Sequence, residues 1–307
     1  MTISEKLHLI LKLSELTQQE LAGRLGVTFA ALNRWINNRA VPRPKAREKI
    51  DELYKELSGE RQIPKTVLEA KKSMVLRRAK AHKNVLKEIL ANPDVRDQFY
   101  LSLTYNSNRI EGSTLSEGET AAILFENVAI PNKTLVEQME AKNHQAALAY
   151  LFQHLISKKP LDEKLILKMH SILMNAIRSD AGLYRNHGAR IMGTHVPTAN
   201  YLKVPVLMKK LVKDMNHNTS DIFSHIADIH GRFEKIHPFS DGNGRVGRLI
   251  MNAMALRKNL APVVVLQEKR RQYAAYLSKA QITDDLSLLE DFVCDAIMEG
   301  FRIVERT

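Results

Sequence analysis

A glycine-rich turn between two helices constrains the fold of this chain more than any other stretch. Residues 237–248 read His-Pro-Phe-Ser-Asp-Gly-Asn-Gly-Arg-Val-Gly-Arg. From Val246 onward, apolar residues recur at helical spacing, so the turn leads directly into the N-terminus of a helix. A glycine turn lets the backbone approach a ligand closely, and the N–H groups of Gly242, Asn243 and Gly244 together with the helix dipole favour an anion. The stretch therefore predicts a phosphate-binding turn.

The charged residues of the same turn indicate what would happen to that phosphate. Arg245 and Arg248 are three residues apart, so both lie on one face of the helix and can clamp phosphate oxygens. Asp241 is a ligand for a hard cation such as Mg²⁺, which normally accompanies a nucleoside triphosphate. His237, with an ordinary pKa of roughly 6.5, is a suitable general base. These residues predict a site for phosphoryl or nucleotidyl transfer.

This stretch resembles the Fic family motif, His-Pro-Phe-x-(Asp/Glu)-Gly-Asn-Gly-Arg-x-x-Arg, at every fixed position. The resemblance implies an all-α fold, namely a Fic-type helical core with a short β-hairpin flap. It also implies an enzyme that transfers AMP from ATP to a Ser, Thr or Tyr hydroxyl of a target protein, or of the chain itself, with release of pyrophosphate. Because the second glycine and both arginines of the motif are present, transfer of AMP is favoured over transfer of another part of the nucleotide.

The resemblance assigns each residue of the turn a role. His237 would accept the proton of the target hydroxyl, and Asp241 would hold Mg²⁺ across the α- and β-phosphates. Backbone N–H groups of residues 242–244 would bind the phosphates, with a further contact from the Asn243 side chain. Arg245 and Arg248 would hold the β- and γ-phosphates.

A second motif lies upstream, at Ser107-Asn-Arg-Ile-Glu-Gly112. Glu111 falls in the last turn of a predicted helix, where the helix dipole disfavours a carboxylate, and Gly112 suits the residue that follows the helix. A residue placed against local preference is expected to have a partner elsewhere. The stretch resembles the Fic inhibitory motif, Ser/Thr-x-x-x-Glu-Gly/Asn, whose positions fall on Ser107, Glu111 and Gly112. The resemblance implies that Glu111 pairs with Arg248 and blocks the γ-phosphate.

Two further regions receive roles from the resemblance alone. The stretch from Arg190 to Pro197 is rich in turn residues and resembles the Fic flap, which pairs with the main chain of the target. Gly193, Thr194 and His195 would face the ligand there. Tyr273 and Gln281 would lie near the adenine.

Residues 1–60 predict a small helical domain. Thr17 and Glu20 form a capping box at the start of one short helix, Gly26 permits a tight turn, and Thr28 caps a second helix. The stretch is similar to XRE-like helix-turn-helix modules. That similarity implies DNA contacts from the following residues: Gln18, Thr28, Phe29, Asn33 and Arg34. A helical docking module without DNA binding is the alternative.

The remaining organisation follows from charge and composition. Between residues 61 and 90, Lys and Arg far outnumber acids, so we expect a basic linker helix over 61–95, followed by the Fic domain over 96–307 with the inhibitory motif near 107–112. The net charge of +12 is compatible with a polyanionic partner or with a solvated helix face. One cysteine in 307 residues excludes internal disulfides, and no apolar run is long enough for a membrane span. The expected location is cytoplasmic. Homo-oligomerisation is left open, since no heptad seam is present.

Two other functions remain open at this point. Glu111 could position a water molecule and remove AMP from a modified protein, as in some relatives with this glutamate. Alternatively, the chain could be a DNA-binding regulator whose Fic core senses a nucleotide. An intact His237 argues against the sensor, because a sensor does not need a base.

Overall fold

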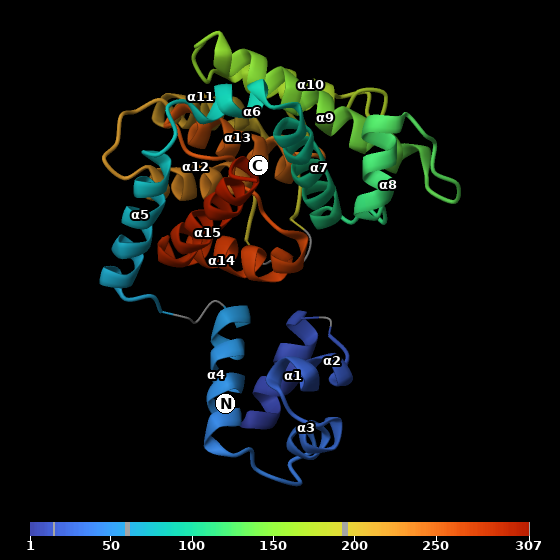
Figure 1. The fold of residues 1–307 in the computed structure, drawn as a ribbon, viewed down its shortest axis with the longest axis vertical. Coiled ribbons are helices and arrows are strands. Elements are labelled where there is room, and N and C mark those ends of the chain that lie inside the picture. The colour runs from blue at the N-terminus through green and yellow to red at the C-terminus, as the bar shows by residue number, and fades with distance from the viewer. Residues whose placement is uncertain (15, 59–61, 192–195, 307) are drawn as a thin grey trace.

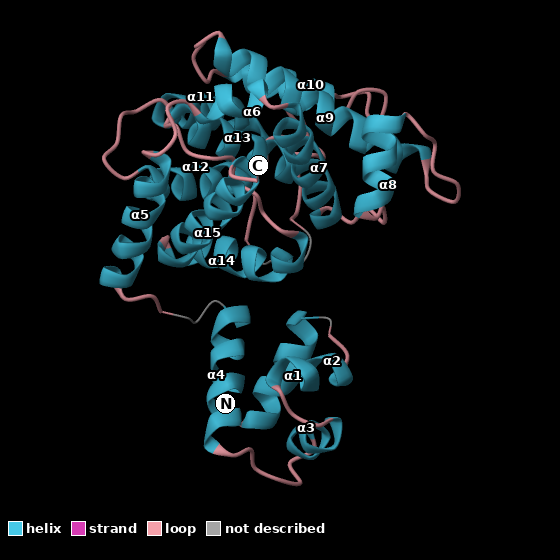
Figure 2. Ribbon diagram, viewed as in Figure 1, coloured by secondary structure: helices cyan, strands magenta, loops and turns pink. Residues whose placement is uncertain are grey.

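The computed structural model describes residues 1–14, 16–58, 62–191 and 196–306. Helices and their connecting loops make up all of these residues, and no strand occurs among them (Figures 1 and 2). The predicted all-α class is therefore confirmed for the described part of the chain. The predicted β-hairpin flap is not shown: the flanking residues 190–191 and 196–200 are not strands, and 192–195 lie outside the described residues.

The N-terminal body contains four helices around one small core. Leu21, Leu32, Trp35 and Ile50 are among the residues buried in that core. The helices are α1 (Ile3–Ser14), α2 (Gln18–Leu25), α3 (Phe29–Ile36) and α4 (Pro44–Ser58). Both predicted caps are present, because the Thr17–Glu20 capping box starts α2 and the Thr28 side chain accepts a hydrogen bond from the N–H of Ala31 (3.3 Å). The sequence prediction of a helix-turn-helix unit is confirmed.

The second body is larger and has one extensive hydrophobic core. Its first helices are α5 (Lys65–Ala79), α6 (Val85–Ala91), α7 (Pro93–Ile110), α8 (Glu117–Ala121), the π-helix η1 (Ala122–Glu126), α9 (Leu135–Ile156) and α10 (Glu163–Leu173). Its remaining helices are η2 (Tyr201–Lys203), α11 (Val204–Met215), α12 (Ile222–Ile236), α13 (Asn243–Arg257), η3 (Gln267–Lys269), α14 (Arg270–Thr283) and α15 (Ser287–Val304).

Helix α13 is the centre of this body. Every residue from Val246 to Leu256 is buried, which is expected only when neighbours cover a helix on all sides. Helices α7, α9, α10 and α12 pack against it. Because neighbours pack around its interior, the N-terminus of α13 and the turn 237–242 before it are held in a fixed position.

The basic stretch 61–95 does not form the single linker helix that its charge pattern predicts. Residues 80–84 interrupt it, and the Asn84 side chain accepts a hydrogen bond from the N–H of Lys87 (2.9 Å) to start α6. Val75, Val85 and Ile89 are fully buried in the large core. Helices α5 and α6 are therefore part of the second body.

Several cations of that stretch are already paired within the molecule. Lys71 lies 2.5 Å from Asp291 of α15, and Lys72 lies 2.5 Å from Asp221 and 2.6 Å from Glu290. Arg78 pairs with Glu305. These contacts attach α5 to α15 and reduce the positive charge that this helix offers to a polyanion.

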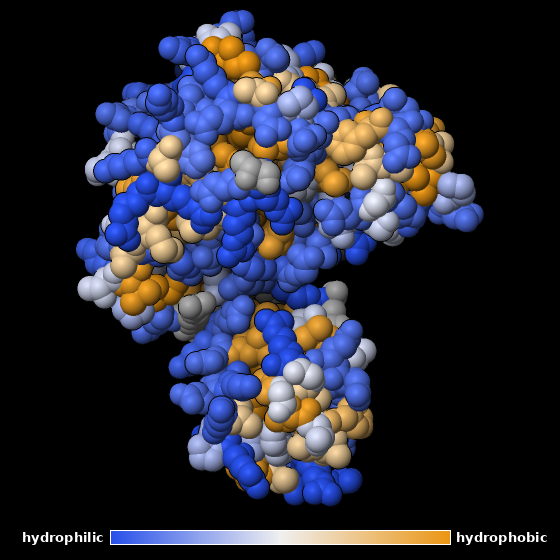
Figure 3. Space-filling model, in the orientation of Figure 1, coloured by the Kyte–Doolittle hydropathy of each residue, from blue (hydrophilic) through white to orange (hydrophobic). Residues whose placement is uncertain are grey.

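The two bodies touch through α4 and α14 (Figure 1). Arg271, near the start of α14, donates a hydrogen bond to the carbonyl oxygen of Lys12 in α1 (3.3 Å). At the right of the second body in this view, α8 and the loop after it project as an arm with apolar side chains on its surface (Figures 1 and 3). Phe125, Val128 and Leu135 are exposed there. No helix of the described residues has the length and apolar character needed to cross a membrane.

Candidate active site

His237 ends α12 in an unfavourable backbone conformation. Its φ of 50° is left-handed, which costs a non-glycine residue roughly 1–2 kcal/mol. Its N–H donates to the carbonyl oxygen of Phe233 (2.9 Å). Burial lowers the pKa of the imidazole below its ordinary value, so the ring is neutral at pH 7 and able to accept a proton.

Arg185 holds the catalytic turn in this conformation. Its Nε donates to the carbonyl oxygen of His237 (2.7 Å), and its backbone N–H donates to that of Pro238 (2.9 Å). The guanidinium also donates to the carbonyl oxygens of His187 and Ala199, both at 2.5 Å. The sequence motifs did not predict a role for Arg185.

His170 supports the same turn from α10. Its ring stacks on Phe239 with centroids 3.7 Å apart, and its Nε2 lies 3.0 Å from the carbonyl oxygen of Asp241. Its Nδ1 accepts the N–H of Gly182 (2.8 Å). His170 thus connects α10 to the turn through stacking and two hydrogen bonds.

The N-terminus of α13 lies where the glycine turn predicts an anion site. Gly242 is the N-cap with φ of 78°, and the N–H groups of Asn243, Gly244 and Arg245 follow as the first groups of the helix, which have no acceptor within it. The Asn243 side chain, predicted to contact phosphate as well, is committed elsewhere. Its Oδ1 accepts the N–H of Phe239 and its Nδ2 donates to the carbonyl oxygen of Phe239, both at 2.9 Å. Only its backbone N–H remains available.

Glu111 reaches from the end of α7 into this anion site. Its Oε1 accepts a hydrogen bond from Arg248 Nη2 (2.6 Å). The same carboxylate lies against the Cα of Gly244, because a Cβ added there would overlap Glu111 Oε1. Gly112 follows with φ of 107°, which glycine tolerates best and which ends the helix at this point.

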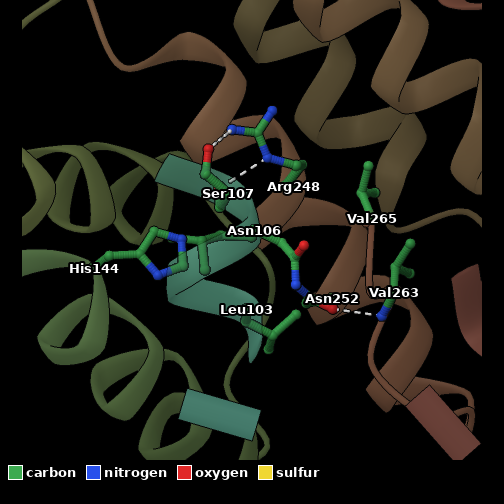
Figure 4. Close-up of a pocket in the computed structure, with 9 residues that line it drawn as sticks. Leu103, Asn106, Ser107, His144, Arg248, Asn252, Val263 and Val265 are labelled. Carbon is green, nitrogen blue, oxygen red and sulfur yellow. Dashed lines mark hydrogen bonds between the residues drawn. The ribbon is translucent and has the colours of Figure 1, made fainter. Parts of the chain in front are cut away.

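Ser107 completes the contact one turn earlier in α7. Its hydroxyl accepts from Arg248 Nε (2.9 Å) and its carbonyl oxygen accepts from Arg248 Nη2 (3.1 Å). Ser107 and Arg248 are both nearly fully buried. Figure 4 shows these hydrogen bonds beside a small cavity between α7, α9 and α13. The structure thus brings together Ser107, Glu111 and Arg248, which are far apart in the sequence.

Arg245 is held differently from Arg248. Its Nη1 donates to Glu140 Oε1 of α9 (2.5 Å), and its Nη2 lies 3.4 Å from Asp241 Oδ1. The guanidinium is only 3% exposed. Sequence reasoning did not find Glu140, because nothing in the local pattern of α9 distinguishes it from a surface glutamate.

Asp241 fits the predicted role of cation ligand. Its carboxylate is half exposed at the mouth of the turn. The described residues contain no cluster of three or more His, Cys, Asp or Glu suited to a metal ion. A single carboxylate is nonetheless what Mg²⁺ uses when a nucleotide supplies phosphate oxygens as further ligands.

The remaining predicted ligand-facing residues do not meet at an open surface. Tyr273 is buried and its hydroxyl lies 2.5 Å from His230 Nε2, and the amide of buried Gln281 donates to the carbonyl oxygen of Gly231 (3.0 Å). Both side chains thus attach α14 to α12. The predicted flap positions Gly193, Thr194 and His195 lie outside the described residues.

The helix-turn-helix module presents part of its predicted DNA-contacting set to solvent. Thr28, Phe29 and Arg34 are exposed on α3. Asn33 is partly covered, since its Nδ2 donates to Gln18 Oε1 of α2 (3.2 Å). Gln18 and Asn33 therefore connect the two helices as well as lying on the predicted face.

Together, the helical core and the turn define a class of protein: one in which a carboxylate, a neutral histidine and the N-terminus of a buried helix lie on one turn. Comparison with known proteins gives the family. Residues 160–255 match the model of the Fic/DOC family, and residues 7–58 match a helix-turn-helix model. Residues 160–255 are thus similar to Fic/DOC domains, and the stretch similar to helix-turn-helix modules precedes them.

Curated relatives include two animal proteins. The protein adenylyltransferase fic-1 of Caenorhabditis briggsae is 34% identical over 195 residues, which cover 62% of this chain and 38% of the relative. The protein adenylyltransferase Fic of Nematostella vectensis is 33% identical over 199 residues, covering 60% and 44%. The chain thus spans less than half the length of these relatives.

Solved structures agree on the fold. Fic-1 (residues 134–508) of Caenorhabditis elegans matches with a TM-score of 0.68 at 24% identity, covering 93% of this chain and 84% of that one. A Fic domain containing signaling protein from Bacteroides thetaiotaomicron matches with a TM-score of 0.66 at 23% identity, covering 76% and 97%.

Proposed function

We propose that this chain is an autoinhibited protein adenylyltransferase, which transfers AMP from ATP to a Ser, Thr or Tyr hydroxyl of a target protein or of itself. The observation that carries the proposal is the convergence of His237, Asp241 and the N-terminus of α13 on one side of a turn that Arg185 and His170 hold in place. Relatives named protein adenylyltransferase support the choice of reaction.

The chemical step follows from these residues. The target oxygen forms a bond to the α-phosphorus, the bond from that phosphorus to the bridging oxygen breaks, and pyrophosphate leaves. Neutral His237 takes the hydroxyl proton. The N–H groups of Asn243 and Gly244 bind phosphate oxygens, where charge neutralisation provides most of the catalysis. The N–H of Gly242, predicted to bind phosphate as well, donates instead to Asp241 Oδ1 (2.6 Å). Mg²⁺ held by Asp241 would supply further positive charge to the phosphates.

The two arginines have separate parts in this proposal. Arg248 would hold the terminal phosphate once Glu111 has left it, because both compete for one guanidinium. Arg245 would support the turn, since its guanidinium is buried and already bound to Glu140. Residues 190–197 would act as a flap that aligns the main chain of the target, with Gly193, Thr194 and His195 facing it. Tyr273 and Gln281 would support the adenine side through α12.

Transfer of label from ATP tests the proposal. The Glu111→Gly variant is incubated with ATP labelled at the α-phosphate and, separately, at the γ-phosphate, with the chain itself and a cell lysate as acceptors. We expect the Glu111→Gly variant to label protein from α-labelled ATP only. The double variant Glu111→Gly with His237→Ala should label no protein. Labelling from γ-labelled ATP would instead establish a kinase.

The reverse reaction is an outcome of the same experiment. Protein labelled by Glu111→Gly is purified and incubated with the wild type. Release of labelled AMP that requires Glu111 would show that the wild type acts mainly as a hydrolase of AMP-modified protein, with Glu111 positioning water. No labelling by any variant would leave the nucleotide sensor as the better description.

We also propose that residues 1–60 bind DNA, because α3 exposes Thr28, Phe29 and Arg34 at the positions where helix-turn-helix proteins contact the major groove. The Lys and Arg residues of α5 that are already in ion pairs would contribute little to DNA binding. A mobility shift with duplex DNA at low salt should weaken as salt is raised, and Arg34→Ala with Phe29→Ala should abolish it. No shift of the wild type at low salt would indicate a protein-docking module.

A further inference from the structure

We infer that Glu140 keeps Asp241 available to a divalent cation by holding Arg245. This inference rests on the proposed function, in which Asp241 is the cation ligand. It assigns Glu140 the part of a positioning residue, which contacts neither nucleotide nor metal.

Arg245 lies between two carboxylates that compete for it. Glu140 Oε1 accepts from Nη1 at 2.5 Å, whereas Asp241 Oδ1 lies 3.4 Å from Nη2. The first distance is that of a strong charge-assisted hydrogen bond, and the second is at the limit of hydrogen bonding. Arg245 is therefore bound mainly by Glu140 and only weakly by Asp241, whose Oδ1 accepts its short hydrogen bond from the N–H of Gly242 instead (2.6 Å).

The burial of Arg245 makes the competition between Glu140 and Asp241 matter for the charge balance at the turn. Arg245 is 3% exposed and its Nε has no hydrogen-bond partner, so the guanidinium has unused donors and little access to water. Asp241 is 51% exposed and Glu140 is 18% exposed. Without Glu140, the Asp241 carboxylate would be the only one left within reach of a nearly dry cation, and the two would pair closely.

Close pairing with Arg245 would oppose binding of a cation at Asp241. The guanidinium would occupy the carboxylate oxygens and would place a positive charge beside the cation site. With Glu140 present, its charge offsets that of Arg245, so less positive charge lies beside the Asp241 carboxylate. Glu140 lies on α9, 105 residues before Arg245 in the chain. Through Arg245 it thus controls how tightly Asp241 binds a cation.

Binding of Mn²⁺ tests the inference with a readout other than activity. Mn²⁺ affinity is measured by electron paramagnetic resonance with the full chain, the α,β-methylene analogue of ATP, and Glu111→Gly as the parent. We expect Glu140→Gln to weaken Mn²⁺ binding about tenfold. Replacing the whole pair, Glu140→Met with Arg245→Met, should return the affinity to within about threefold of the parent. Glu126→Gln, at an exposed glutamate, is the matched control and should have no effect.

Each other outcome is decisive. Unchanged Mn²⁺ affinity in Glu140→Gln would overturn the inference. A double variant as weak as Glu140→Gln would also overturn it, because Glu140 would then act by a route that does not involve Arg245. If Glu140→Gln fails to fold, the double variant alone carries the test, since removing both charges of a buried pair is tolerated better than removing one. If the parent itself binds the nucleotide without retaining Mn²⁺, the metal role of Asp241 in the proposed function fails, and the inference fails with it.

Discussion

The Glu111 carboxylate and the Arg248 guanidinium are joined by a 2.6 Å hydrogen bond across the mouth of the anion site. The two residues are 137 positions apart, one at the end of α7 and one in the second turn of α13. In the proposed function, a phosphate at the N-terminus of α13 would displace this carboxylate, because both would use Arg248 and because Glu111 lies against Gly244. Because Glu111 lies at the end of α7, the packing of α7 would then determine whether a phosphate can bind at the site.

Ser107→Ala should loosen that contact. The variant leaves buried Arg248 Nε without its acceptor, so we expect a loss of about 1–2 kcal/mol in the free energy of unfolding. The rate of AMP transfer should rise severalfold, since Arg248 is then held less firmly toward Glu111. Chemical denaturation and the labelling assay measure the two effects. Ser73→Ala, at an exposed serine of α5, should change neither. A stable Ser107→Ala variant with unchanged activity would remove Ser107 from the inhibitory contact.

Gly244→Ala should separate two contributions to the free energy of unfolding: contact with Glu111 and the helix propensity of the residue. Gly244 has ordinary helical dihedrals, so alanine would favour the helix by up to about 1 kcal/mol if space allowed. In the wild type, the new methyl group would overlap Glu111 Oε1. We expect Gly244→Ala to destabilise the wild type and to be neutral or stabilising in Glu111→Gly, with a coupling of about 2 kcal/mol. Additive changes in unfolding free energy would contradict the observed placement of Glu111.

Glu234 offers a pH-dependent prediction. This residue of α12 is buried, its Oε1 has no hydrogen-bond partner, and a Cβ added at Gly247 would lie 2.5 Å from it. Burial, with a contribution from the charge of Glu111, raises the pKa of its carboxyl to about 8. An acid whose pKa is raised on folding favours the folded state fully below its unfolded pKa of about 4.5, and that stability is lost as pH rises toward 8.

Glu234→Gln should remove this loss. The variant is expected to be more stable than the wild type at pH 7.5, by on the order of 2 kcal/mol, and equally stable near pH 4.5. Urea denaturation at the two pH values measures the difference. Glu126→Gln, at an exposed glutamate, should show no such dependence. An unchanged difference between pH 4.5 and 7.5 would mean that Glu234 is not held protonated by its surroundings.

Local features were predictable from the sequence because their partners are close in the chain. The capping box of Thr17 and Glu20, the turn at Gly242 and the end of α7 before Gly112 each depend on a few neighbouring residues. The interruption of the basic helix was missed, although Asn84 is a recognisable N-cap, because the charge pattern continues through it.

Long-range contacts were predictable only where a family motif supplied them. The resemblance named Ser107, Glu111 and Arg248 together, and the structure brings them into contact. No motif connected Glu140 to Arg245 or Arg185 to His237, and hydrophobic periodicity carries no information about which buried charges meet. The resemblance assigned the Asn243 side chain to phosphate. Its hydrogen bonds to Phe239 depend on how the turn folds, so the sequence could not show that the side chain is already bound.

The most direct test of the account is the initial rate of AMP transfer by Glu111→Gly relative to the wild type at one ATP concentration. A charge-assisted hydrogen bond of about 1.5–3 kcal/mol predicts a rate increase of roughly 10- to 100-fold once Arg248 is released. Glu126→Gly, which removes an exposed glutamate instead, should match the wild type. Equal rates for Glu111→Gly and the wild type, with both variants active and folded, would contradict the claim that this carboxylate closes the site.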